Sequence, residues 1–238
     1  MSISKAQNVL QEIWNLYGTY AINEYGKINS YNTDVIEEFF FVILGGYGIS
    51  YEHNMSGLQI LKSRGLIESK LYRSDSEILK TALKIELEFN TSQFEPRKAD
   101  GSLRKYRFVT TKPMVISAAG QWLWNECEWN LGGKLAGLDA YVARDWLCRC
   151  PGFGMKSASW FLRNTGMNND CAVLDVHVMR FLRRFDLDFP DNLTTKAYLV
   201  LEDKLRTICD NIGASLGVMD YLLWILGRNG YLAHVHVR

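Results

Sequence analysis

The sequence of 238 residues contains no run of about eighteen apolar residues. A membrane-spanning helix is therefore not expected. The opening residues, MSISKAQNVLQEIWNLYG, follow the pattern of an amphipathic helix. They lack the charged start, apolar centre and small-residue cleavage site of a signal peptide. We therefore expect a soluble cytoplasmic protein that does not bind membranes.

Paired cysteines are also missing. The five cysteines are odd in number, and none of them forms the CxxC spacing of a zinc site or an iron-sulfur cluster. Cys148 and Cys150 are the closest pair, and we expect them to be core residues rather than ligands. Neither a metal nor another cofactor is expected.

Proline occurs only four times, and alternating strand-like runs are scarce. Apolar residues recur at helical spacing instead, so the sequence predicts a mainly α fold. The least regular stretch is 88–111, which we interpret as an exposed basic connection with a loop or short hairpin. The expected helices are 3–25, 33–45, 53–64, 74–87, 112–130, 136–148, 155–164, 175–186, 194–211 and 214–228.

The net charge of +1 gives no global argument for nucleic acid, but the charges are unevenly distributed. Between Arg144 and Arg184 there are seven basic and three acidic residues. A solvated helix face explains part of this excess. A track for phosphates explains it better if a binding motif lies within it.

Such a motif is present at 147–156, LCRCPGFGMK, between two helical patterns. Pro151, Gly152 and Gly154 predict a tight turn. Glycines leave the backbone N–H groups and the following helix N-terminus open to a phosphate oxygen. An ordinary connection between helices is the alternative, since PGxG alone is common.

Two side chains near this turn have the chemistry of a catalytic pair. Lys156 lies in the first turn of the second helix, where the positive end of the helix dipole favours the neutral, nucleophilic amine. The spacing equally fits a lysine that only contacts phosphate. Asp175 follows the apolar run CAVL and is predicted to cap the next helix. It is either only a cap or a carboxylate that the cap holds opposite the amine.

The residues CPGFGMK followed by LDVHV resemble the helix-hairpin-helix DNA glycosylase superfamily, whose signature is LPGxGxK and then an aspartate in VDxH. The run KSASWFLRNTG and AVLDVHVMRFL looks most similar to the compact microbial branch of the 8-oxoguanine DNA glycosylases. The similar regions cover most of 37–186 and, more loosely, 218–228.

The resemblance implies a two-lobed helical fold with the hairpin at the cleft. One lobe would be 33–135, with a wedge loop and the basic connection. The other would be 1–32 plus 136–238, with the helix-hairpin-helix at 140–164. The implied activity is that of a bifunctional DNA glycosylase/AP lyase, nucleoid-associated and monomeric, which excises an oxidised purine, 8-oxoguanine, from double-stranded DNA.

The resemblance also assigns roles to residues. Lys156 carries over as the Schiff-base nucleophile and Asp175 as the catalytic aspartate. Helical spacing places Trp160 on the same face as Lys156, and it places Tyr221 on the same face as Trp224. These three rings are candidates for the walls of a base pocket. One of Tyr221 and Trp224 is expected to be a core residue instead. The expected DNA contacts are Gly152, Gly154, Met155, His177, Arg149 and Arg107, and the wedge candidates are Tyr51, His53 and Asn54.

Two departures from the family keep other hypotheses open. The sequence begins directly with a helical pattern, without the β-domain of larger relatives, and Cys150 stands where the family usually has leucine. One alternative is a glycosylase for a different modified base, in repair or in defence against foreign DNA. Another is a non-catalytic helix-hairpin-helix module in which Lys156 contacts phosphate and Asp175 is only a cap.

Overall fold

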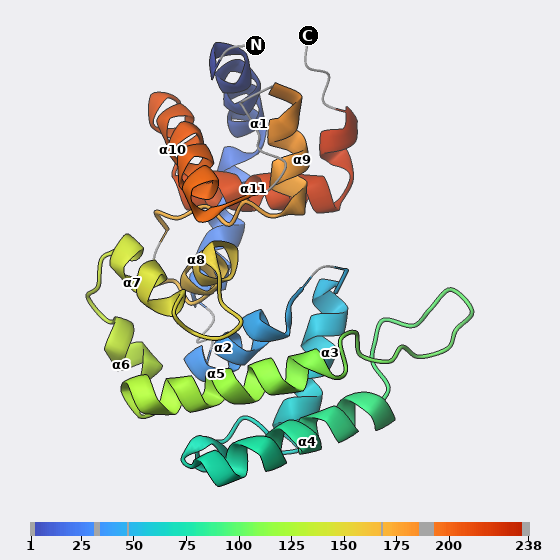
Figure 1. Cartoon of the computed structure of the whole chain (residues 1–238). Helices are drawn as coiled ribbons and strands as arrows, with labels where there is room; N and C mark the ends of the chain where they lie inside the picture. Colours follow the sequence, from blue (N-terminus) through green and yellow to red (C-terminus); the bar gives the residue numbers. More distant parts are fainter. Residues whose placement is uncertain (1–2, 31–33, 47, 168, 186–192, 235–238) are drawn as a thin grey trace. The chain divides into compact units, whose positions relative to one another are not determined.

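The computed structural model describes residues 3–30, 34–46, 48–167, 169–185 and 193–234 (Figure 1). Within these ranges the regular structure is helical, and the only β contact is an isolated antiparallel bridge between Phe94 and Arg104. The predicted mainly α fold is therefore confirmed. None of the described helices is long and apolar enough to cross a bilayer. The helices are α1 (Ile3–Ser30), α2 (Val35–Leu44), α3 (Tyr51–Ser63), η1 (Ser69–Tyr72), α4 (Asp75–Thr91), α5 (Thr111–Cys127), α6 (Leu131–Leu135), α7 (Ala140–Leu147), α8 (Met155–Asn164), α9 (Val176–Leu182), η2 (Arg183–Phe185), α10 (Thr195–Asn211), α11 (Leu216–Arg228) and η3 (Tyr231–His234).

The helix boundaries follow the sequence pattern closely in most places. The expected helix 155–164 coincides with α8. The helix expected at 136–148 starts later, at Ala140, because Gly137 adopts a left-handed φ of 75° after the separate short helix α6. Helix α4 continues to Thr91, past the predicted end, since Phe89 extends its buried face.

The chain divides into two compact units. Unit 1 consists of residues 1–32, 139–144 and 155–238, and unit 2 of residues 33–138 and 145–154. The predicted lobes differ from these units at 136–138 and at 145–154, the turn segment. The prediction assigns both segments to the second lobe, and both lie in unit 2. The lobes as working parts of a DNA enzyme stay a prediction.

Unit 1 is built around α11. Residues 216–223 of this helix are all buried, which is the pattern of a helix surrounded on every side. Helix α1 packs against it with one apolar stripe that includes Ala6, Leu10 and Ile13, and α9 and α10 complete the core. The elements that carry the predicted lysine and aspartate, α8 and the start of α9, therefore belong to one rigidly packed unit.

Unit 2 is built around α2, whose residues 38–44 are all buried. Helices α3 and α5 pack against α2, and α4 packs against α5. Close packing explains one glycine in α5. A Cβ on Gly120 would lie 2.3 Å from the Tyr72 ring, so the buried tyrosine occupies the space that any larger residue would need.

Candidate active site

The turn between α7 and α8 is fixed by glycine and by aromatic packing. Gly152 has a φ of 86°, and a Cβ on it would come within 2.6 Å of Val115 Cγ1. The next residue, Phe153, is buried and stacks on Phe39 with ring centroids 5.1 Å apart. Cys150 is also buried, so it fills the place of the family's leucine as an apolar side chain, and burial raises the pKa of its thiol.

Gly154 differs from Gly152 in its surroundings. No atom lies within 4 Å of a Cβ built on Gly154, and its φ is not left-handed. The turn's packing therefore does not require glycine at this position. The residue is exposed, as is Arg149 on the other side of the turn, so both face solvent.

Lys156 is exposed in the first turn of α8, one residue after the half-buried Met155. Trp160 lies one helical turn further on and is half-buried. Side chains four residues apart in a helix share a face, so the lysine and the tryptophan point to the same side of α8.

Asp175 caps α9, as the sequence predicts. Its Oδ1 accepts hydrogen bonds from the backbone N–H groups of His177 at 2.8 Å and Val178 at 2.9 Å. Its Oδ2 accepts none from the residues that the structure describes. The cap therefore holds the carboxylate through Oδ1, and the residue is half-buried.

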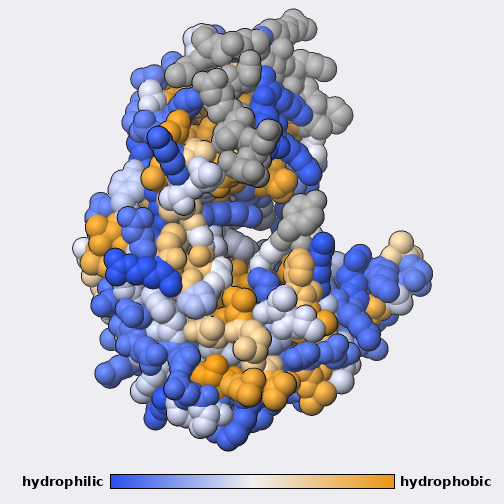
Figure 2. Space-filling view, in the orientation of Figure 1, coloured by the Kyte–Doolittle hydropathy of each residue, from blue (hydrophilic) through white to orange (hydrophobic). Residues whose placement is uncertain are grey.

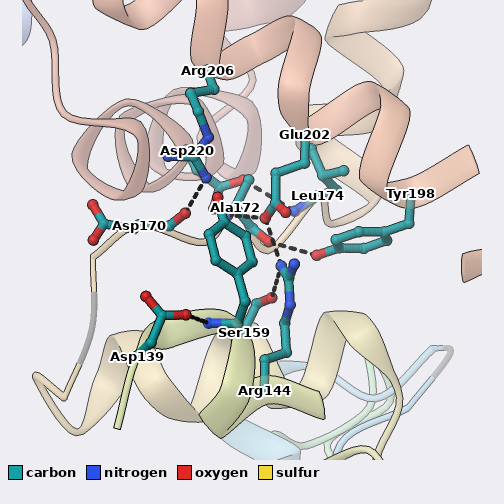
Figure 3. Close-up of polar contacts among 11 residues, drawn as sticks. Asp139, Arg144, Ser159, Asp170, Ala172, Leu174, Tyr198, Glu202, Arg206 and Asp220 are labelled. Carbon is teal, nitrogen blue, oxygen red and sulfur yellow. Dashed lines mark hydrogen bonds and ion pairs between the residues drawn. The ribbon is translucent and has the colours of Figure 1, made fainter. Parts of the chain in front are cut away.

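The segment before Asp175, residues 171–174, lies outside the helices and pairs with no strand among the described residues. Its polar backbone groups bond to side chains instead (Figure 3). The N–H of Ala172 donates to Glu202 at 2.7 Å, and its carbonyl accepts from the Tyr198 hydroxyl. Glu202 also accepts from Arg144 at 2.7 Å, with both side chains buried.

A second buried ion pair binds the same segment two residues closer to Asp175, at Leu174 instead of Ala172. Asp220, in α11, accepts from Arg163 at 2.9 Å and from the N–H of Leu174 at 3.0 Å. Burial raises the pKa of Asp220 to about 6, against the lowering effect of the Arg163 charge. Asp220 is not among the residues that the sequence motifs predict, although an aspartate within the apolar stretch LGVMDYLLWIL is a visible signal.

These ion pairs correct one expectation. The seven basic residues that suggest a phosphate track in the sequence include Arg144 and Arg163. Both are buried and paired inside unit 1, with Glu202 and Asp220 as their partners. They neutralise internal carboxylates, because a buried carboxylate requires a compensating charge.

The pocket candidates on α11 occupy different environments. Tyr221 is buried, and its ring makes an edge contact with the ring of Tyr25. It also stacks with Trp224, and the centroids of these two rings are 5.8 Å apart. Trp224 itself is half-buried. Trp224 is therefore the more exposed ring of this pair, with the Arg228 guanidinium 5.4 Å from its ring centroid.

His177 is half-buried in the first turn of α9. It lies so close to α11 that a Cβ on Gly227 would be 2.7 Å from the histidine Cβ. The glycine thus allows α9 to approach α11 closely and sets where the imidazole emerges.

The three wedge candidates are also in different environments. Tyr51 is 47% exposed at the start of α3. His53 is buried and stacks on Tyr106 at 5.1 Å, and burial lowers the pKa of its imidazole. Asn54 is buried and donates to the carbonyl of Phe41 at 2.7 Å. Only Tyr51 presents its side chain to solvent.

Arg107 is exposed at the end of the basic connection, with its guanidinium over the ring of Phe108. It lies against Gly48, in the loop before α3, where a larger residue would collide with the guanidinium. Arg107 thus contacts the loop that leads to Tyr51 in unit 2.

The predicted residues are divided between the two units. Unit 1 holds Lys156 and Asp175 with Met155, Trp160, His177, Tyr221 and Trp224, and unit 2 holds Gly152, Gly154, Arg149, Arg107, Tyr51, His53 and Asn54. Among the residues that the structure describes, no group of three or more histidines, cysteines or carboxylates is placed to hold a metal ion.

Comparison with known proteins decides the family. Residues 79–214 match the Ogg-HhH family, described as 8-oxoguanine DNA glycosylase. The matched range covers more than half of the chain and includes Lys156 and Asp175. The chain belongs to this family.

This member of the 8-oxoguanine DNA glycosylase family has relatives that are named 8-oxoguanine DNA glycosylase/AP lyase. It is 29% identical over 179 residues to the 8-oxoguanine DNA glycosylase/AP lyase of Saccharolobus islandicus, covering 74% of this chain and 77% of the relative. The enzyme of the same name from Thermotoga petrophila is 42% identical over 100 residues, 40% of this chain and 48% of the relative.

A solved structure shares the fold of this 8-oxoguanine DNA glycosylase family member. It is the Methanocaldococcus jannaschii 8-oxoguanine glycosylase/lyase in complex with a 15mer DNA containing 8-oxoguanine. The TM-score is 0.64 at 22% identity, over 94% of this chain and 97% of the other. The expected helical glycosylase fold is confirmed.

Proposed function

We propose that this protein is a bifunctional DNA glycosylase/AP lyase that excises 8-oxoguanine from double-stranded DNA through a Schiff base on Lys156. The family match and the names of the relatives support the substrate and both activities. The observation that carries the assignment of the nucleophile is an exposed lysine in the first turn after a glycine turn, in the same unit as a capped aspartate with one free oxygen.

The reaction requires the damaged base to leave the stack, because a side chain does not reach C1′ within the duplex. The neutral Lys156 amine attacks C1′. The bond to the base breaks, and the base leaves with the bonding electrons and takes up a proton. The lysine nitrogen, now bonded to C1′, loses a proton. The sugar ring then opens as the C1′–O4′ bond breaks and O4′ takes up a proton, which leaves a Schiff base between C1′ and Lys156. The Schiff base loses a proton from C2′ and expels the 3′ phosphate, which cleaves the strand.

Asp175 stabilises the positive charge that develops on the sugar as the base departs. Two backbone N–H groups hold Oδ1, so the carboxylate does not rotate freely. The free Oδ2 is the oxygen that faces the sugar in this proposal. The same residue is therefore a cap and a catalytic group.

In this proposal the turn binds the DNA backbone. The N–H groups of Gly152, Gly154 and Met155 donate hydrogen bonds to phosphate oxygens. Arg149, His177 and Arg107 add contacts to the DNA backbone. The lesion strand is thereby held without recognition of its sequence.

The connection between α4 and α5 extends this binding surface. Residues 92–107 form a hairpin-like segment joined by the bridge from Phe94 to Arg104, and they contain five basic and two acidic residues. One acidic residue, Asp100, accepts two hydrogen bonds from Ser102 within the turn. The projecting segment is mostly hydrophilic (Figure 2), as expected of a surface for phosphates.

The flipped purine stacks on Trp160 and Trp224 in this proposal, with Tyr221 as support. Stacking on such rings contributes roughly 1–3 kcal/mol per base. Tyr51 fills the gap in the duplex. One chain supplies the lysine and the aspartate, so the proposed active species is a monomer.

Borohydride trapping tests the nucleophile. The substrate is a duplex with one 8-oxoguanine, and borohydride reduces the Schiff base to a stable cross-link. We expect wild type to cross-link and Lys156→Gln not to. The matched control is Lys196→Gln, because Lys196 is an exposed lysine at the second position of α10, as Lys156 is of α8.

The outcomes separate the alternatives. Trapping by Lys156→Gln would remove the assigned nucleophile. A panel of duplexes, each with one modified base, tests the substrate. If the protein releases another base but not 8-oxoguanine, the substrate assigned here is wrong. No release from any duplex, with binding intact, would identify a non-catalytic helix-hairpin-helix module.

A further inference from the structure

The backbone immediately before Asp175 is strained. Leu174 has a φ of 46°, in the left-handed region that a branched residue avoids. Such a conformation costs about 1–3 kcal/mol and persists where the surroundings hold it. What holds Leu174 therefore determines where the following carboxylate points.

The Leu174 side chain is packed in the core of unit 1, and its backbone N–H is held by Asp220. The Asp220 side chain is fully buried, and its two oxygens have separate partners. Oδ1 accepts from the N–H of Leu174 (Figure 3), and Oδ2 accepts from Arg163. Arg163 lies in the last turn of α8, seven residues after Lys156 and hence on the same face of that helix.

One buried carboxylate thus joins the helix of the lysine to the residue before the aspartate. We propose that Asp220 is a positioning residue that sets Asp175 relative to α8 and its Lys156. The inference rests on the proposed function of Lys156 and Asp175. It adds a part to the site that contacts neither the DNA nor the reacting atoms.

Stability alone is a weak reason for this arrangement. A buried ion pair is often replaced by apolar side chains with little loss, or even a gain, of stability, because the charges lose their hydration. Directed hydrogen bonds fix geometry in a way that apolar contacts do not. Arg163 and Asp220 therefore contribute orientation, which catalysis needs to within a fraction of an ångström.

Unit 1 contains a natural control for this argument. Arg144 and Glu202 form a second buried ion pair, and Glu202 likewise accepts from an N–H of the segment 171–174. That N–H belongs to Ala172, two residues further from Asp175. Both pairs stabilise the segment, but only Asp220 bonds to the neighbour of the aspartate.

The experiment compares two leucine pairs, Arg163→Leu with Asp220→Leu and Arg144→Leu with Glu202→Leu. Each double variant removes both charges, so neither is left with an unpaired buried ion. The measurements are the melting temperature, the Kd for an undamaged duplex and the single-turnover rate of 8-oxoguanine release, well below the melting transition. We expect the first pair to slow base release roughly ten- to a hundredfold with Kd unchanged. The second pair should release the base at nearly the wild-type rate.

Equal rates in the two leucine pairs, or losses that follow the melting temperatures, would overturn the positioning role. If a leucine pair does not fold, Asp220→Asn and Asp220→Ala in an Arg163→Gln background replace it. The amide oxygen of asparagine still accepts from Leu174, so the asparagine variant should be the faster of the two, and equal rates would again overturn the role. Wild type that releases no base would overturn the proposed function itself.

Discussion

Gly152 lies directly against Val115, so that a Cβ on the glycine would sit 2.6 Å from the valine Cγ1. Two residues later, a Cβ on Gly154 would meet nothing within 4 Å. The two glycines of one turn therefore have different reasons to be glycine. The first is required by packing and by its left-handed φ, and the second is free of both constraints.

Alanine at the two positions should consequently affect different properties. Gly152→Ala should lower the free energy of unfolding by about 1–3 kcal/mol. Gly154→Ala should leave stability unchanged and weaken DNA binding, because its methyl group would block a phosphate from the backbone. Thermal melts and Kd values for one undamaged duplex measure both effects. Unchanged DNA binding by Gly154→Ala would argue against a phosphate contact at that position.

Asp175→Asn tests the aspartate. The amide oxygen can still accept from the N–H groups of His177 and Val178, so the cap is retained while the charge is lost. We expect DNA binding and melting temperature near those of wild type, with base release slowed by about a hundredfold or more. Comparable losses of binding and of base release would favour an aspartate that is only a cap.

The basic hairpin predicts a salt effect. Lys98 and Lys105 are exposed, and replacing both with glutamine should reduce the slope of log K against log salt by about 1.8 if each contacts one phosphate. The matched control replaces Lys70 and Lys80, exposed lysines elsewhere in unit 2. An equal change in slope for both double variants would mean that the hairpin has no special contact with DNA.

Lys112 predicts a pH effect on stability. Its amine donates to the carbonyls of Ile43 and Gly45 at the end of α2, and burial lowers its pKa to about 8. Between this value and the usual pKa near 10.5, the unfolded chain binds a proton that the folded chain does not. The contribution of Lys112 to stability therefore rises as the pH increases from about 8 to about 10.5, and it is lost as the pH falls through about 8.

The comparison with Lys112→Met isolates this contribution from other titrations. Wild type should gain melting temperature relative to the methionine variant as pH increases from about 8 to about 10. Melts of both proteins in matched buffers give the difference. A difference that is flat with pH would mean that the lysine keeps its ordinary pKa in the folded state.

Local features of the site follow from the sequence alone. The bounds of α8, the cap at Asp175 and the tight turn at Gly152 depend on residues within a few positions of each other. Helix periodicity, capping and the left-handed φ of glycine are short-range effects, so a linear sequence contains the information needed to predict them. The family motif is short-range in the same sense, since it joins the turn to Lys156.

Only the tertiary structure decided which polar residues are internal. Arg144 and Glu202 are 58 positions apart, and Arg163 and Asp220 are 57 apart, so no local pattern distinguishes them from surface charges. The same holds for His53 and Asn54, which fit the wedge segment by sequence yet are buried. The burial and the pairing of these side chains depend on how helices distant in the sequence pack together. They are therefore determined by the tertiary structure.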